Sequence, residues 1–287
     1  MSQTFGDGGS NNTYSLDGPG QAGPKLGIYD EESAQSSVLG QRKYFEDGRT
    51  FRYSHFVATS VQGKVMAQDF SVSGFASIDG KFTDSAGSAK DDYTTTDDTL
   101  YLTDTDTFSA ADVADVYAGG YFAITDAAGE GYNYRIKSND LGTSAGLMKI
   151  VLHDDLEAAL DSESSCAIVG NMYRNLRPAT AATDNLVAGV TPNSMTAAYY
   201  GWLQTWGICN CLVDASAGTV ASSATAVLSD GVTGAVTILG QGTAQASEAL
   251  ITSDFDYSAV TTEPILGFFT DATTNGEYGH IYLQLCW

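Results

Sequence analysis

The sequence predicts a mainly β fold: a β-sandwich or barrel-like body with a small inserted β-module and an extended N-terminal arm. Short stretches that alternate apolar and polar residues recur along the chain, separated by turns rich in Ser, Thr, Gly and Asp. Strands at such spacing are typical of sandwiches and barrels. No stretch has the composition of a long helix, and the chain holds 31 glycines.

The first 37 residues are expected to form a flexible, glycine-rich arm. Residues 6–12 and 17–24 consist of turn formers and lack a periodic apolar pattern. Such a segment cannot offset by itself the entropy lost when its backbone is ordered. We therefore expect a neighbouring subunit to hold the arm.

Strand-like alternation begins after residue 38. Residues 51–57, 61–66 and 70–75 place apolar side chains at alternating positions, as in half-buried strands. The polar run 91–98 interrupts this pattern and indicates a crossing over the surface.

Residues 93–165 are predicted to form the small inserted β-rich module. A glycine-bearing loop, 127–131, is expected to close a hairpin. Two short helices are also expected, one from a capping box at Ser109 to Val116 and one over 154–159. The expected strands are 99–103, 121–126, 132–136 and 147–152.

The last third contains the longest apolar run of the chain, residues 197–213. This run is too rich in Gly, Tyr, Trp and Thr for a helix, so two central strands that meet at Gly207 are predicted. The main β-domain is expected to combine residues 38–92 with 166–287, and its last strand to carry Trp287 into the core. Its later strands are expected at 219–220, 226–228, 235–239 and 279–287.

The charge balance excludes two classes of partner. With 35 acidic and 13 basic residues the formal net charge is −22, so nucleic acid and anionic membranes would repel the chain. No apolar run approaches the roughly 20 residues of a membrane-spanning helix. Residues 1–15 lack the basic and apolar regions of a signal peptide, so we expect a protein outside the classical secretory route.

No motif predicts a catalytic, cofactor-binding or metal-binding residue. His55, His153 and His280 lie far apart in strand-like segments, where a lone histidine is usually structural. Motifs of hydrolases, zinc proteases and P-loop enzymes are absent from the sequence. Cys209 and Cys211 fall on one face of a strand and are expected to be buried apolar side chains rather than zinc ligands.

Two weaker binding patterns stay open. The acidic residues of 97–106 resemble a calcium loop, although the glycine and glutamate of the EF-hand register are missing. A second pattern, the aromatic set Tyr199, Tyr200, Trp202 and Trp206, is either a platform for a sugar or part of a sheet core.

Several segments resemble the virion structural proteins of tailed phages. Residues 39–53, with Leu39-Gly40 followed by Asp-Gly-Arg-Thr-Phe-Arg-Tyr at 47–53, are similar to the segment that opens the folded part of those proteins after a flexible arm. Residues 118–136 and 152–173 resemble their inserted module, and 189–207 their late glycine- and aromatic-rich strand.

This resemblance implies a decoration or minor capsid protein on the outside of a tailed-phage head, made in the host cytoplasm and located on the virion. The implied partners are the major capsid protein lattice and further copies of this chain, for which we expect a trimer. No long helix matches the spine helix of a major capsid protein. A tail or fibre component, a carbohydrate-binding adhesin that uses residues 199–206, and a glycosidase with an acidic pair are the alternatives.

Overall fold

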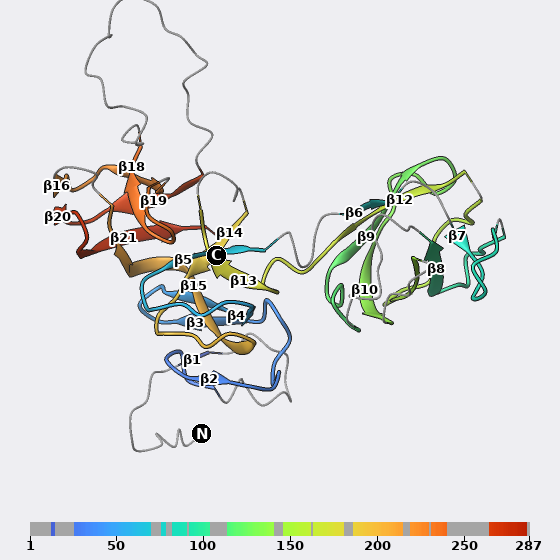
Figure 1. Ribbon diagram of the computed structural model, residues 1–287, viewed down its shortest axis with the longest axis horizontal. Helices are drawn as coiled ribbons and strands as arrows, with labels where there is room; N and C mark the ends of the chain where they lie inside the picture. Colours follow the sequence, from blue (N-terminus) through green and yellow to red (C-terminus); the bar gives the residue numbers. More distant parts are fainter. Residues whose placement is uncertain are drawn as a thin grey trace, which may run out of the picture. The chain divides into compact units, whose positions relative to one another are not determined.

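A computed structural model describes twelve stretches of the chain, and within them every regular element is a strand, which confirms the mainly β fold class that the sequence predicts. The chain divides into two compact units, Met1–Gln68 with Asn175–Trp287 and Asp69–Arg174 (Figure 1). No helix long and apolar enough to cross a membrane occurs in the part of the chain that the structure describes. The described residues are 13–14, 26–69, 76–78, 82–90, 92–103, 114–140, 146–161, 163–180, 186–214, 219–229, 231–239 and 264–285.

The first unit contains a closed ring of five strands. The pairing runs from β4 through β13, β5 and β14 to β15, and β15 pairs again with β4. Because the ring closes, this part of the unit is a small β-barrel, which confirms the predicted barrel-like body. The five strands are β4 (Thr50–Phe56), β5 (Val65–Gln68), β13 (Leu176–Pro178), β14 (Val187–Val190) and β15 (Tyr199–Leu212).

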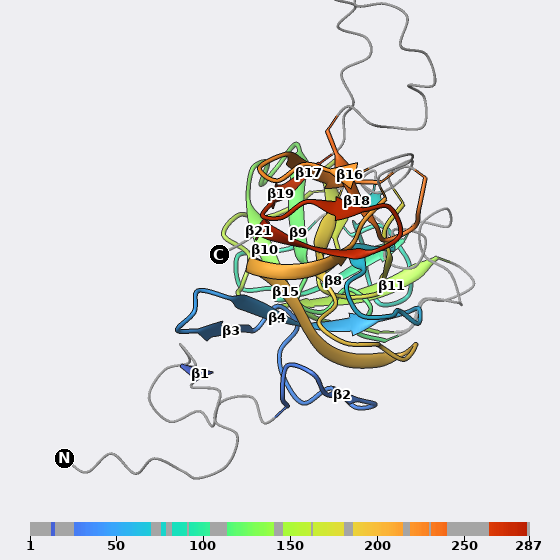
Figure 2. The ribbon, with the colours of Figure 1, turned by 90° about the vertical axis from the view of Figure 1, so that its left-hand side faces the viewer.

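The long strand β15 belongs to the barrel and to a sheet beyond it. Up to Trp206 it pairs with β4, and from Trp206 onward it pairs with β21 (Tyr278–Gln284). A register shift between Gln204 and Trp206 and a φ of +87° at Gly207 let the strand bend without ending, and Figure 2 shows the curve. The two strands predicted to meet at Gly207 are therefore one strand of 14 residues.

Further strands extend this sheet on both sides. β21 is followed by β19, β17 and β18, while β3 and then β1 continue from β4, and a separate pair joins β16 to β20. Of these strands, β16, β17, β18 and β21 were predicted, whereas β1, β3, β19 and β20 were not, and Trp287 lies outside the described residues. The bounds are β1 (Thr13–Tyr14), β3 (Arg42–Phe45), β16 (Thr219–Val220), β17 (Thr225–Leu228), β18 (Val236–Ile238), β19 (Ile265–Phe269) and β20 (Thr273–Thr274).

Residues 26–37 of the expected arm fold onto the barrel of their own chain. β2 (Glu31–Glu32) pairs with β15. The carbonyl oxygen of Leu26 accepts hydrogen bonds from Trp202 Nε1 at 3.0 Å and from Lys43 Nζ at 2.6 Å. This part of the arm therefore has contacts within its own chain, and the hydrogen bond from Trp202 meets the need of a buried indole N–H for an acceptor. Residues 1–25, apart from β1, lie outside the described residues.

Tyr53 holds the same segment in a pH-dependent manner. Its side chain is fully buried, and its hydroxyl donates to Glu32 Oε1 at 2.5 Å and accepts from the Ser36 N–H at 3.1 Å. Burial, and then the hydrogen bond to the Glu32 carboxylate, raise the pKa of Tyr53 to about 12. In the unfolded chain a tyrosine titrates near pH ~10, so neutral Tyr53 stabilises the folded state fully below that pH.

This contribution is expected to disappear as the pH rises from about 10 to about 12, because the unfolded state then loses a proton that folded Tyr53 keeps. Urea unfolding across this pH range should show a fall in the free energy of unfolding that is shallower in Tyr53→Phe. Tyr44→Phe, at an exposed position on β3, is the control and should leave the fall unchanged. An identical fall in Tyr53→Phe and the parent chain would contradict the prediction.

The second unit is one antiparallel sheet of seven strands that curls around a core of its own. β10 pairs with β9 up to Arg135 and with β11 from Ile136, with a register shift after Ile136. The edge strands β6 and β7 are joined by only three residues, so the two edges lie within about 15 Å of each other. The order is β6 (Ala76–Ile78), β12 (Ser165–Val169), β9 (Tyr121–Asp126), β10 (Asn133–Asn139), β11 (Leu147–Leu152), β8 (Thr99–Thr103) and β7 (Phe82–Thr83).

The second unit is longer than the predicted insert of residues 93–165. Because β6 pairs with β12 and β7 pairs with β8, the unit takes in residues that the sequence analysis assigned to the main domain. The unit leaves the barrel after Gln68 and returns before Leu176, and these two residues are paired neighbours in adjacent antiparallel strands. The insert thus occupies the position of a hairpin turn.

The two short helices predicted within this module are not observed in its described part. Residues 154–159 form bends, because the Leu156 N–H donates to Asp97 and the Leu160 N–H to Tyr93, instead of to carbonyls one helical turn earlier. Of the helix predicted over 109–116, only the last three residues are described, and they lie in a turn.

Candidate functional site

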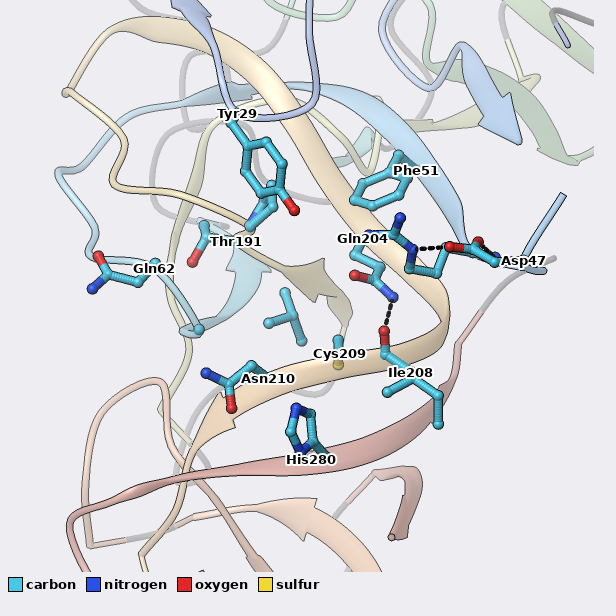
Figure 3. Close-up of a pocket in the computed structure, with 14 residues that line it drawn as sticks. Tyr29, Asp47, Phe51, Gln62, Thr191, Gln204, Ile208, Cys209, Asn210 and His280 are labelled. Carbon is cyan, nitrogen blue, oxygen red and sulfur yellow. Dashed lines mark hydrogen bonds and ion pairs between the residues drawn. The ribbon is translucent and has the colours of Figure 1, made fainter. Parts of the chain in front are cut away.

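A pocket of about 550 Å³ lies in the first unit at the bend of β15 (Figure 3). Its walls come from β15, the start of β4, the end of β14, the loop before β5, β21 and the N-terminal segment. The ring of Phe51 and the exposed ring of Tyr29 contribute apolar surface. The polar lining includes Gln62, Thr191, Gln204, Asn210 and His280.

The pocket exists because β14 and β15 are joined by a single pair of residues and then separate. Val190 and Gln204 are partners, and β15 then bends away at Gly207. The ring closes again at Gly63, which donates to the Thr191 carbonyl at 2.7 Å and accepts from the Leu212 N–H at 2.9 Å. The space between these two closures is the pocket.

Gln204 is a deeply buried polar side chain of the pocket, with 5% of its surface exposed. Its Nε2 donates to the carbonyls of Trp206 at 3.0 Å and Ile208 at 2.8 Å, which uses both amide hydrogens. The side-chain amide therefore supplies the hydrogen bonds that a neighbouring strand would otherwise donate to these two carbonyls of the bent part of β15. Its Oε1 is turned into the pocket, with no hydrogen-bond donor among the described residues (Figure 3).

The charged groups at the rim are paired. Arg49 Nε lies 2.7 Å from Asp47 Oδ2, and the Arg49 N–H donates to the same carboxylate at 3.0 Å. Burial alone would raise the pKa of Asp47, but the hydrogen bonds and positive charge of Arg49 lower it below its usual value. Asp47 is thus ionised at neutral pH, and Arg49 compensates its charge.

His280 forms a second pair at the rim. Its Nδ1 lies 3.2 Å from Asp271 Oδ2, and its backbone N–H donates to Asp271 Oδ1 at 3.0 Å. Burial works to raise the pKa of Asp271, but the hydrogen bonds from His280 and from the Thr273 hydroxyl lower it. The contact engages Nδ1 and leaves Nε2 for a ligand.

The three histidines are not brought together. His55 Nδ1 lies 3.0 Å from the Asn175 side-chain oxygen, and its ring packs on Tyr200 at 4.7 Å, which is a structural role. His153 lies in the second unit, where its backbone N–H donates to the Arg135 carbonyl. Only His280 lies at the pocket, and no feature of its local sequence marks it.

The cysteines behave as buried apolar groups. Cys209 and Cys211 point to the same side of β15, as predicted, and their sulfur atoms lie 3.6 Å apart. Burial raises the pKa of Cys211 well above its usual value, so its thiol is a poor nucleophile at neutral pH. Cys166 is buried in the second unit, and Cys286 lies outside the described residues.

Within the described ranges, no group of three or more His, Cys, Asp or Glu side chains is placed to hold a metal ion. The acidic segment 97–106, which resembles a calcium loop, is described only up to residue 103. In that part the Asp97 carboxylate accepts hydrogen bonds from the Thr94 N–H at 2.7 Å and the Thr94 hydroxyl at 3.2 Å.

The four aromatic residues of β15 do not form one exposed platform. Trp202 is fully buried, with its ring against Tyr53 at 5.5 Å. Tyr200 stacks on Tyr53 at 5.9 Å, whereas Trp206 packs edge-on against Tyr282. For Trp202 the core interpretation is correct, because its ring fills the space between the barrel and the N-terminal segment.

Comparison of this chain with protein-family models, curated proteins and solved structures found no match.

Proposed function

We propose that this chain is a structural protein of a tailed-phage virion, bound to the outside of the capsid lattice as a decoration protein that stabilises the head. One observation carries the proposal beyond the resemblance of the sequence. An exposed apolar row crosses three strands of the first unit, with Ile208 on β15, Tyr282 on β21 and Phe268 on β19 as direct partners. Trp206 packs edge-on against Tyr282 at 5.9 Å and widens the row.

This row has the character of a protein–protein contact. Ile208 is 46% exposed and Phe268 43% exposed, although both lie in regular strands of a well-packed sheet. Contiguous apolar side chains of this kind mark interaction surfaces, because contact with a partner removes them from water. A paired sheet presents them rigidly, so little conformational entropy is lost on binding.

The proposed partners of the row are neighbouring virion subunits, either further copies in a trimer or the major capsid protein. On a capsid, many copies bind at once, so a modest affinity for each contact is sufficient. The net charge of −22 fits an outer layer, since like-charged particles repel one another in solution.

A cryo-EM reconstruction of particles that carry the protein, with its copy number measured by quantitative mass spectrometry, tests the proposal. An ordered outer layer over the capsid shell, at hundreds of copies, is the expected result. A few copies on the tail would favour the tail or fibre alternative, and absence from particles would overturn both.

Phe268→Ser is expected to lower the number of copies per particle at least tenfold, because it removes the exposed aromatic ring at the β19 end of the row. Circular dichroism should show an unchanged fold, since the side chain is exposed. The control is Tyr121→Ser, which removes an aromatic ring that is 50% exposed on β9 of the second unit. If particles carry as many copies of the Phe268→Ser chain as of the parent chain, the row is not the surface that contacts the virion.

A further inference from the structure

We infer that the pocket at the bend of β15 is a binding site for a neutral sugar unit. The inference does not depend on a virion role, because the residues and the experiment are those of the isolated chain. It also differs from a platform on the aromatic residues of β15, since the buried Trp202 takes no part in the pocket.

The first argument is the orientation of Gln204. Two hydrogen bonds from Nε2 to backbone carbonyls fix its amide plane, so Oε1 is held facing the pocket (Figure 3). Because the Gln204 side chain is 95% buried and its Oε1 faces a fixed direction, this oxygen needs a hydrogen-bond donor. A hydroxyl group in the pocket supplies that donor at little entropic cost to the protein.

The second argument is the kind of polar group around this acceptor. The Asn210 amide offers both a donor and an acceptor, and the Gln62 amide keeps its Nε2 donor while its Oε1 accepts from the Ser194 hydroxyl at 3.0 Å. His280, the direct partner of Asn210 on the neighbouring strand β21, adds its Nε2. Such mixed, uncharged groups match ligand hydroxyls, each of which donates and accepts.

The third argument is charge. Asp47 is the one carboxylate among the residues that line the pocket, and it is paired with Arg49, so neither an anion nor a cation finds an uncompensated counter-charge there. Anionic ligands such as nucleotides are further opposed by the net charge of −22. A neutral ligand is therefore favoured.

The fourth argument is shape and apolar surface. The Tyr29 ring is 60% exposed and stands beside the pocket, while Phe51 and Ile208 add apolar surface to its lining. A sugar ring carries a face of C–H groups that packs on an aromatic ring while its hydroxyls bind polar groups. The volume of about 550 Å³ lies within the usual range of small-molecule pockets.

The test is binding of glucose, galactose, mannose, N-acetylglucosamine and their short oligomers to the full chain, by saturation-transfer NMR and calorimetry. At least one neutral sugar is expected to bind, and glucuronate to bind at least tenfold more weakly than glucose. Tyr29→Ala and Asn210→Ala should each weaken binding at least tenfold. Both side chains are exposed, so circular dichroism should show an intact fold.

Tyr44→Ala is the matched control, because Tyr44 is a tyrosine of the same unit that is 40% exposed on β3 and outside the pocket. It should bind as the parent chain does. The inference is overturned if no neutral sugar binds, or if binding survives both Tyr29→Ala and Asn210→Ala. Neither result bears on the copy number in particles, so the two proposals fail separately.

Discussion

Replacement of Trp202 by Ala is expected to lower the free energy of unfolding of the first unit by about 4 kcal/mol. Trp202 is fully buried among Leu39, Phe51 and Tyr53, so its removal leaves a large cavity. The change also removes the indole donor to the Leu26 carbonyl and the ring beneath the Lys43 ammonium, which lies 4.7 Å from the ring centre. The N-terminal segment then loses its main attachment to the barrel.

Urea unfolding followed by circular dichroism measures the change in stability, and hydrogen exchange of residues 26–37 measures the release of the segment. Trp206→Ala is the control on the same strand, because Trp206 is only partly buried and contacts Tyr282 on the sheet surface. Its expected cost is about 1 kcal/mol. Equal losses in the two variants would contradict the placement of Trp202 in the core.

Replacement of Gly189 by Ala is expected to cost about 3 kcal/mol or more and to open the barrel between β14 and β15. A Cβ at Gly189 would lie 2.4 Å from the backbone oxygen of Gln204 and 2.8 Å from Leu203 Cγ. Because the nearest atom belongs to the backbone of β15, the strand itself has to move. The only pair between β14 and β15, Val190 with Gln204, adjoins this position.

The matched control is Gly276→Ala. Gly276 has a φ of +79°, and a Cβ there would meet no atom within 4 Å. The free energy of unfolding is therefore expected to fall by only roughly 1–2 kcal/mol, the cost of a left-handed backbone conformation in a residue other than glycine. Urea unfolding and hydrogen exchange of the Val190 amide distinguish the two variants. A Gly189→Ala chain as stable as Gly276→Ala would show that the close approach of the two strands is not required.

Much of the strand content could be predicted because side-chain alternation is a local property. The predicted strand 51–57 corresponds to β4 (Thr50–Phe56), and the shared face of Cys209 and Cys211 follows from their spacing of two residues. The helix predicted over 154–159 was wrong because Leu156 and Leu160 bond to distant carbonyls, which no local pattern reveals.

The candidate site was not predictable, since its residues are far apart in the sequence. Tyr29 and His280 line the same pocket although 250 intervening residues separate them. The one local signal is Gln204, a polar residue within the longest apolar run and three positions before Gly207. A buried glutamine beside a bend needs partners, but the sequence does not say that these are the Trp206 and Ile208 carbonyls.

The sequence alone determined the fold class, the acidic character and most strands, because composition and alternation with a period of two are properties of each segment. The tertiary structure decided which strands are neighbours: the ring from β4 to β15, the insert between Gln68 and Leu176, and the pocket where β14 and β15 separate. Strand pairing depends on hydrogen bonds and packing between segments distant in the chain. Many strand pairings are compatible with the same local pattern, and only the packing of the complete domain selects one of them.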